Sequence, residues 1–392
     1  MPADGQTIPA IWQTAGFGIY VHWPFCAAKC PYCDFNSHVA MRIDHDAWAD
    51  AYETDLDRWA ELTSDRVVRS VFFGGGTPSL MEPATVARVI DRIAQNWHMA
   101  NNVEITLEAN PTSSERERFA GFQAAGVNRV SLGVQALNDV DLQRLGRLHD
   151  ASEALVAVDM AKTLFDRVSF DLIYARQDQN EAQWEAELTK ALSLGMDHLS
   201  LYQLTVEPGT PFHARQSRDK LRGLPDEDRA VALYELTQDL CLQAGLPAYE
   251  VSNHARPGSE SRHNLIYWRG GDWLGIGPGA HGRVDQPEGR IATAAVRSPD
   301  AWLRAVKDGD DLVDDRMVAS RQDQAEEYLM MSLRLTEGSE LSRLAMLGYA
   351  LPPDSLAELV EDGLLLLDRG YLRTTDRGRL LLNAVLSKLL SG

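Results

Sequence analysis

The stretch YVHWPFCAAKCPYCDF, residues 20–35, sets three cysteines into a loop that follows a short run of β-branched and aromatic residues. Cys26, Cys30 and Cys33 are separated by three and then by two residues. Thiolates ligate zinc and iron–sulfur clusters, and close spacing on a turn lets three of them hold one inorganic unit. The fourth cysteine, Cys241, lies far away in a helical pattern, so a four-iron cluster would keep one iron open to a ligand from outside the chain.

Two other readings of the cysteines remain open on spacing alone. A structural zinc site would take His22 or His38 as the fourth ligand of a Cys3His set. The three residues could also be inert core cysteines. Ligand softness favours the iron–sulfur reading, and four cysteines in 392 residues are too few for a disulfide framework.

The composition narrows the function classes. With 38 Lys plus Arg against 57 Asp plus Glu, the formal charge is −19, and such a surface repels phosphate backbones, so we expect no nucleic-acid partner. At 44% hydrophobic and 24% charged, the chain has the composition of a globular protein of two or three domains. No apolar run is long enough to cross a bilayer, and the first fifteen residues do not read as a secretory signal. We therefore expect a cytoplasmic protein.

Short β-branched or aromatic runs alternate with amphipathic segments, which is typical of βα units and a parallel sheet. Six strands are predicted, over residues 17–22, 70–73, 103–108, 129–134, 168–174 and 198–204. Polar and Gly-containing segments follow the strand ends. Because the carboxyl ends of parallel strands meet at one rim, we expect the functional residues to gather there, on an open sheet or a partial barrel.

The later part of the chain changes character. Residues 247–282 are rich in Gly, His, Asn and aromatics and read as a structured loop that closes the barrel. We expect an N-terminal segment over 1–16, a barrel domain over 17–285 and a C-terminal domain over 298–392. The last of these reads as helix, helix, hairpin and helix, which predicts a mostly helical, winged-helix-like module.

Together these motifs carry a resemblance. The cysteine stretch, followed in order by GGGTPS, ITLEANP, NRVSLGVQ, FDLIY, LSLYQLTVEPGTPF and RHNLIYW, resembles radical S-adenosylmethionine (SAM) proteins, and specifically the oxygen-independent coproporphyrinogen III oxidase-like family. It covers roughly residues 17–390. The resemblance implies an α/β fold, a partial (β/α)6 radical SAM barrel with the C-terminal helical domain beside it.

One position separates two branches of that family. The oxidase branch has a fourth cysteine two residues after the third, where this chain has Phe35. An N-terminal extension typical of the oxidases is also missing ahead of the first predicted strand. The HNLIYW motif and the Cys-Asp-Phe sequence are similar to the haem chaperone branch. We therefore expect a haem chaperone, with a coproporphyrinogen oxidase as the alternative and a zinc-dependent binding module as a third reading.

The resemblance also implies the site residues. Cys26, Cys30 and Cys33 would hold a [4Fe–4S] cluster whose open iron takes the amino and carboxylate groups of SAM. The residues carried over to SAM are Tyr20 and Tyr32 on the adenine side, Gly75, Gly76 and Thr77 at the methionine end, Glu108 and Arg147 at its charges, Gln135 and Asp171 at the ribose, and Gln203 and Ala280 near the adenine. From the residues alone, GGGTP is equally consistent with a tight strand-to-helix turn.

One loop departs from the family. After the fifth predicted strand, where a Gly-Leu-Pro-Gly-like turn is common, this chain has Ala175, Arg176, Gln177 and Asp178. The departure leaves Asp171 intact and makes the conformation of the loop, and any SAM contact from it, an open question.

For haem, the resemblance points to His263, with Tyr267 and Trp268 as packing faces, and to His281 or His254 as alternative imidazoles. The same motif reads equally well as a hydrogen-bonded clasp at the barrel rim, because Asn, His, Tyr and Trp all carry polar groups that need buried partners.

The implied activity is to bind haem and deliver it to an apo-haemoprotein, such as a respiratory cytochrome or membrane oxidase. The resemblance also implies an electron donor, such as a flavodoxin or ferredoxin, and a homodimer. The resemblance permits SAM cleavage, and leaves open whether cleavage drives haem release or whether SAM and the cluster gate dimerisation and transfer.

Overall fold

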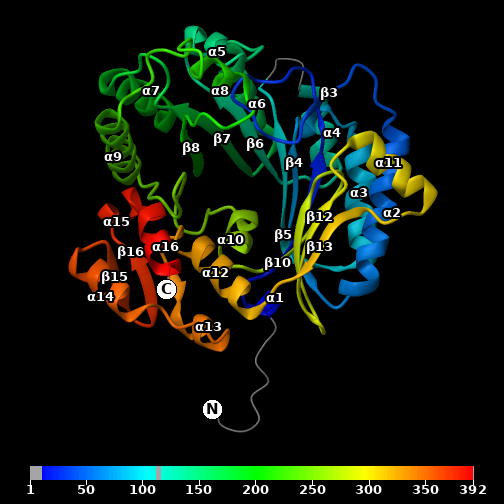
Figure 1. Ribbon diagram of the computed structural model, residues 1–392. Coiled ribbons are helices and arrows are strands. Elements are labelled where there is room, and N and C mark those ends of the chain that lie inside the picture. The colour runs from blue at the N-terminus through cyan, green and yellow to red at the C-terminus, as the bar shows by residue number, and fades with distance from the viewer. Residues whose placement is uncertain (1–10, 112–115, 392) are drawn as a thin grey trace.

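The computed structural model describes residues 11–111 and 116–391 (Figure 1). Residues 1–10 of the expected N-terminal segment lie outside the described residues. Residues 11–14 form the short helix α1 (Ile11–Thr14), which leads into the first strand.

A mixed sheet of eleven strands forms the centre of the larger unit. Its strands are β1 (Phe17–Trp23), β4 (Val67–Gly75), β5 (His98–Ala109), β6 (Arg129–Gln135), β7 (Arg167–Tyr174), β8 (His198–Gln203), β9 (Asn253–Ala255), β10 (Asp272–Ile276), β11 (His281–Gln286), β12 (Gly289–Ala295) and β13 (Val313–Val318). The order across the sheet is β13-β12-β11-β10-β1-β4-β5-β6-β7-β8-β9. All six predicted strands are present, as β1 and β4 to β8, and neighbours among them pair in parallel. The predicted α/β fold is confirmed.

Besides α1, the helices of this unit are α2 (His45–Thr63), η1 (Pro78–Leu80), α3 (Pro83–Asn96), α4 (Arg116–Ala124), α5 (Asp139–Arg144), α6 (Ala151–Leu164), α7 (Glu181–Ser193), α8 (Pro211–Gln216), α9 (Glu227–Gln243), α10 (Arg262–Trp268) and α11 (Pro299–Asp308). The longer helices α2, α3, α6, α7 and α9 cover the outer face of the sheet, whereas α10 lies on its inner side (Figure 1). On α3, Val86, Val89, Ile90 and Ile93 recur at helical spacing and are all buried in the main core. Capping boxes begin α6 and α7, where side chains satisfy backbone N–H groups that a helix start leaves without partners.

The prediction of a structured loop over residues 247–282 was wrong in part, because the segment adds β9 and β10 to the sheet, contains α10 and begins β11. β10 lies beside β1 and runs parallel to it, and its five residues are buried. Gly275 interrupts the pattern of strand-forming residues, so the sequence does not read as a strand. Glycine is nevertheless required at this position, because a Cβ would lie 2.3 Å from the carbonyl oxygen of His281. The helix α10 precedes β10 and packs against β1, β4 and β10.

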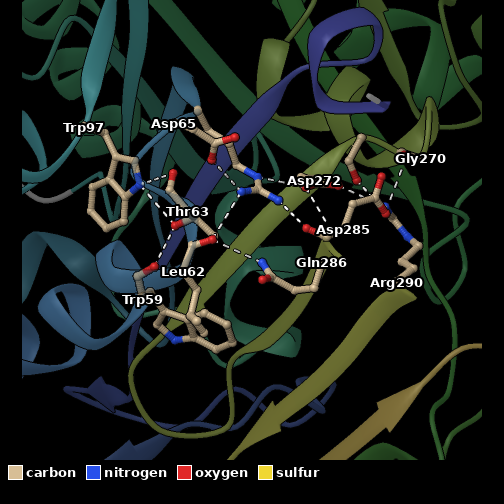
Figure 2. Close-up of polar contacts among 12 residues, drawn as sticks. Trp59, Leu62, Thr63, Asp65, Trp97, Gly270, Asp272, Asp285, Gln286 and Arg290 are labelled. Carbon is tan, nitrogen blue, oxygen red and sulfur yellow. Dashed lines mark hydrogen bonds and ion pairs between the residues drawn. The ribbon is translucent and has the colours of Figure 1, made fainter. Parts of the chain in front are cut away.

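The amino end of β10 is held by a buried ion network (Figure 2). Asp272 accepts hydrogen bonds from Arg66 at 3.1 Å, from Arg290 at 2.9 Å and from the backbone N–H of Asp285 at 3.0 Å. Arg290 also donates to the carbonyl oxygen of Gly271 at 2.6 Å. Since Asp272 is the first residue of its strand, the network lies at the end of the sheet opposite to the cysteine loop. Its role is structural.

The C-terminal unit has a core of its own. It contains α12 (Arg321–Ser332), β14 (Ser339–Glu340), α13 (Leu341–Met346), α14 (Pro353–Glu361), β15 (Leu365–Asp368), β16 (Tyr371–Thr374), α15 (Asp376–Leu380) and α16 (Leu382–Leu390). Leu329, Leu344, Leu372 and Leu386 belong to one buried cluster within it. The expected mostly helical domain with a hairpin is present.

Strands β11 to β13 carry the sheet past the expected domain edge at residue 285. Trp302 and Leu312 still belong to the main core, whereas Ala325 belongs to the C-terminal core. We propose that the boundary between the two units lies near Ala319. Within the described residues no helix is long and apolar enough to cross a membrane.

Candidate functional site

The cysteine loop leaves the carboxyl end of β1. It folds back on itself through a short parallel pair, β2 (Phe25–Cys26) and β3 (His38–Val39). Cys26 is buried and Cys30 and Cys33 are partly exposed, and all three thiols are free. The N–H of Cys33 donates to the carbonyl oxygen of Cys30 at 3.2 Å, which closes a turn between the second and third cysteines.

The glycine motif packs against this loop by its backbone. The N–H of Gly76 donates to the carbonyl oxygen of Trp23 at 2.7 Å, and that of Thr77 to the carbonyl oxygen of Phe25 at 2.8 Å. A Cβ on Gly76 would lie 2.6 Å from the latter oxygen, so only glycine permits this approach. The hydroxyl of Thr77 consequently lies 3.5 Å from the Sγ of Cys26.

Arg147 brings a positive charge to the same rim. Its guanidinium lies 3.4 Å from the Sγ of Cys30, and it donates to the Asn110 side-chain oxygen at 2.6 Å and to the Gly133 carbonyl oxygen at 2.9 Å. Asn110 in turn donates to Thr77 at 3.4 Å. The ends of β4, β5 and β6 are thus joined beside the cysteines. The sequence reasoning missed Asn110, although it lies in the EANP motif quoted for the resemblance.

Two acids lie further inside the same rim. Burial and the nearby charge of Asp171 raise the pKa of Glu108 to about 8, and a hydrogen bond from the backbone of Gly75 offsets part of that rise. Burial raises the pKa of Asp171 to about 6, and a hydrogen bond from the Ser200 hydroxyl offsets part of that rise. Within residues 11–111 and 116–391, neither carboxylate forms an ion pair. A cationic ligand would relieve the repulsion between them.

One of the two predicted tyrosines lies on β1 and the other lies in the cysteine loop. On β1, the hydroxyl of Tyr20 is 2.9 Å from Nδ1 of His22, whose Nε2 is 2.9 Å from the carbonyl oxygen of Asn36. Tyr32 lies in the cysteine loop, where its ring packs against Phe212 with centroids 6.3 Å apart. His22 is therefore engaged in fixing the cysteine loop, which is a role that the sequence reasoning did not find.

The remaining predicted SAM residues surround these. Gly75 has a φ of 112° and packs against the His22 ring. Gln135 ends β6 with a φ of 69°. Gln203 ends β8 and is exposed, while Ala280 is buried in the turn before β11.

The residues fit a [4Fe–4S] cluster with SAM. Three free thiols share one loop, and a cation lies beside one of them. Glu108 near the end of β5 and Asp171 on β7 form no ion pair within the described residues.

The HNLIYW motif forms α10 under this rim. The His263 ring is buried, with ring centroids 4.4 Å from Phe72, 4.3 Å from Tyr267 and 5.9 Å from Tyr20. Burial lowers the pKa of His263 to about 3, and its Nδ1 has no hydrogen-bond partner among the described residues. Trp268 lies at the far end of the helix, where Arg334 of the C-terminal unit stacks on its ring.

The two alternative imidazoles differ in exposure. His254 on β9 is buried, and neither ring nitrogen has a hydrogen-bond partner in the described structure. His281 begins β11 and is exposed.

Family comparisons match both units of the chain. A family described as the radical SAM superfamily matches residues 20–191, and one described as the HemN C-terminal domain matches residues 319–381. "Heme chaperone HemW" of Escherichia coli K12 is 38% identical over 381 residues, which cover 95% of this chain and 98% of the relative. "Radical S-adenosyl methionine domain-containing protein 1, mitochondrial" of Bos taurus is 40% identical and covers 95% and 87%.

A solved structure agrees in fold. The coproporphyrinogen III oxidase HemN of Escherichia coli, described as a radical SAM enzyme, superimposes with a TM-score of 0.80 over 95% of this chain and 89% of that one, at 23% sequence identity. Identity at this level shows the fold alone.

Proposed function

Because the chain belongs to the HemW family of radical SAM proteins, we propose that it is a haem chaperone, which binds haem and transfers it to an apo-haemoprotein. The observation that carries the proposal is the match to chaperone relatives over almost their whole length, at 36–38% identity. The cysteine loop supports it. The position of the oxidases' fourth cysteine is Phe35, whose side chain is 59% exposed.

The proposed cluster site rests on the chemistry of the loop. Cys26, Cys30 and Cys33 would hold a [4Fe–4S] cluster, and Arg147 would stabilise the thiolate form of Cys30. Thr77 donates to Cys26 and limits its charge density. When bound, the cluster supplies an electron that can cleave the SAM sulfonium.

The proposed SAM site uses the neighbouring strand ends. Glu108 would accept the SAM ammonium group, because its carboxylate lacks a cationic partner among the described residues. Gly75 to Thr77 would face the methionine end, Gln135 and Asp171 the ribose, and Tyr20, Tyr32, Gln203 and Ala280 the adenine.

For haem we propose His263 as the ligand, with Tyr267 and Trp268 as packing faces. Its Nδ1, which lacks a partner among the described residues, supports the assignment. Because the ring is packed between Phe72 and Tyr267, α10 must move before an iron can reach it. His254 is the next candidate, because both of its nitrogens lack partners in the described residues.

The proposed partners follow from the same family. We propose transfer to an apo-haemoprotein of the respiratory chain, reduction by a flavodoxin or ferredoxin, action as a homodimer and a cytoplasmic location. Transfer from the haem-loaded protein to an apo-cytochrome, followed by the change in its Soret band, tests the acceptor.

A single anaerobic experiment tests the function. Reconstituted protein should bind about four iron atoms per chain and should bind haem, measured as a Soret titration. The same preparation, given SAM, a reductant and coproporphyrinogen, should leave the porphyrinogen unchanged. Conversion of coproporphyrinogen to protoporphyrinogen would contradict the chaperone function and support the oxidase function in its place.

Haem titration of three variants then tests the ligand. His263→Ala should change the Soret maximum and weaken haem binding, while His254→Ala and His281→Ala should bind as the wild type does. An unchanged His263→Ala spectrum would remove His263 from the site.

A further inference from the structure

Arg176 lies buried behind the turn that carries Gln135, in the loop where this chain departs from its family. Its side chain is 3% exposed. One guanidinium nitrogen donates to the carbonyl oxygen of Ile173 at 2.6 Å and to that of Gln135 at 3.4 Å. The other two N–H groups face Asp141, at 3.1 Å and 3.0 Å, and Glu187. Arg176 thus joins the ends of β6 and β7.

Glu187 completes the contact from α7. One carboxylate oxygen pairs with Arg176, and the other accepts a hydrogen bond from the backbone N–H of Leu137 at 2.6 Å. The Arg176–Glu187 pair therefore contacts the chain on both sides of Ala136, at the carbonyl of Gln135 and at the N–H of Leu137. We name these two side chains the turn clamp.

The turn itself is one that a non-glycine residue rarely adopts. Gln135 has a φ of 69°, and the N–H of Ala136 bonds to the carbonyl oxygen of Val134 at 2.9 Å, which closes a three-residue turn around Gln135. The β6–β7 register also shifts between Leu132 and Gln135. Residues in such conformations persist where the surrounding structure holds them.

The turn decides where the Gln135 side chain points. A Cβ on Gly133 would lie 3.0 Å from the Gln135 amide nitrogen and 3.4 Å from the Arg147 guanidinium. The amide therefore lies on the side of the barrel where Arg147 approaches Cys30. Without a held backbone, Gln135 would relax to a negative φ and its side chain would turn away.

We propose that Arg176 and Glu187 are positioning residues for SAM, which hold the Gln135 turn so that its side chain faces the SAM site. The inference rests on the proposed function, because it takes Gln135 as a SAM contact. It adds two residues that do not touch the ligand and that act through Gln135.

A structural role for the pair makes a different prediction. A buried ion pair that only stabilises the loop would lower stability when broken, and would weaken SAM binding whether or not Gln135 is present. The neighbouring Arg144 offers a matched control. It pairs with Asp178 at 3.1 Å, donates to the carbonyl oxygen of Gln177 at 2.9 Å and lies 3.7 Å from Asp141. Its side chain is 41% exposed, and none of these contacts reaches the Gln135 turn.

The experiment uses the full chain with its cluster reconstituted anaerobically. The variants are Arg176→Lys, Glu187→Gln, Gln135→Ala, the double variant Arg176→Lys with Gln135→Ala, and Arg144→Leu. Lys keeps the charge of Arg176 but cannot donate to two carbonyls and two carboxylates at once. SAM affinity is measured from the change in the electron paramagnetic resonance spectrum of the reduced cluster, with iron content and haem titration measured on the same samples.

We expect Arg176→Lys to bind SAM about tenfold more weakly, with wild-type iron content and haem binding. Gln135→Ala should lose a similar factor, and the double variant should be no weaker than Gln135→Ala. Arg144→Leu should bind SAM as the wild type does.

The failures are distinguishable. The positioning role of the turn clamp is contradicted if the wild type binds SAM and Arg176→Lys binds it equally well. It is also contradicted if the two losses of affinity multiply in the double variant. In both cases the proposed function stands. If the wild type binds neither a four-iron cluster nor SAM, both fall. Should Arg176→Lys lose iron and secondary structure, Glu187→Gln is judged by the same criteria.

Discussion

The guanidinium of Arg147 lies 3.4 Å from the Sγ of Cys30, although 117 positions separate the two residues in the chain. The contact sets a permanent positive charge beside one of the three thiols proposed to hold the cluster. Arg147 is itself held by Asn110 and by the Gly133 carbonyl. A charge fixed in this way favours the more negative, reduced state of a bound cluster.

Removing that charge should therefore lower the reduction potential of the cluster. For Arg147→Met we expect a reduction potential on the order of 100 mV more negative. A unit charge about 5 Å away produces an electrostatic potential of this size at an effective dielectric constant of about 20. Arg147→Lys keeps the charge and should shift the potential less. A redox titration followed by electron paramagnetic resonance measures both, and equal potentials in the two variants would contradict the electrostatic role.

Glu108 should make the stability of the cluster-free protein depend on pH. Burial, together with the charge of Asp171, raises its folded-state pKa to about 8, from the ordinary value of 4.5. Between these two values the unfolded chain has released a proton that the folded chain keeps, so the free energy of unfolding falls as pH rises through the window. Glu108→Gln should remove this part of the pH dependence. The free energy of unfolding of the variant, relative to that of the wild type, should therefore be higher at pH 8 than at pH 5.

Urea unfolding at the two pH values measures the effect. A Glu108→Gln variant that loses stability with pH as steeply as the wild type would contradict the raised pKa.

The ion network at the start of β10 should contribute strongly to the free energy of unfolding. Asp272→Asn removes the fully buried carboxylate that Arg66 and Arg290 share, and leaves them only the more exposed partners Asp65 and Asp285. Breaking a buried pair in this way costs about 3–5 kcal/mol. The matched control is Asp65→Asn, which removes another partner of Arg66 whose side chain is 69% exposed. That change should cost less than about 1 kcal/mol. Denaturant unfolding compares the two, and similar losses would refute the distinction.

The hairpin of the C-terminal unit should accept a stabilising substitution. β15 and β16 are joined by Arg369 and Gly370 alone, with φ values of 50° and 87°. Two-residue hairpin loops with two positive φ values favour Asn-Gly. Arg369→Asn should therefore raise the free energy of unfolding by about 0.5–1 kcal/mol, read from the thermal midpoint. A lowered midpoint would show that the exposed Arg369 side chain contributes a contact of its own.

Patterns local in the sequence were enough to predict much of the fold. The six parallel strands were predicted because buried strands read as short apolar runs between amphipathic helices, and all six are present. Strands β9 to β13 of the same sheet were not predicted. In β10, Gly275 interrupts the pattern, and the partner strand β1 lies more than 250 positions earlier in the chain. The contacts of β10 with β1, and not its own residues, make it a strand.

The candidate site divides in the same way. The three thiols, Glu108 and Arg147 were predicted from motifs, and the structure brings them to one rim, while their roles toward a cluster and SAM stay predictions. The contacts that His22, Asn110 and Arg176 make in the structure were not predicted, since His22 was named only as a zinc ligand and Arg176 only as a departure from the family. Nothing in their neighbourhood in sequence marks a histidine that bonds the cysteine loop, an amide that orients an arginine or an arginine that holds a turn.

Residue type and spacing along the chain were sufficient for the cysteine loop, the βα order and the family, because each depends on neighbours within a few positions or on motifs in succession. The conformation of Gln135, the buried ring of His263 and the partners of Arg147 depend on strands and helices that meet only after folding. Their hydrogen bonds and stacking join residues tens to hundreds of positions apart, and no local pattern carries that information.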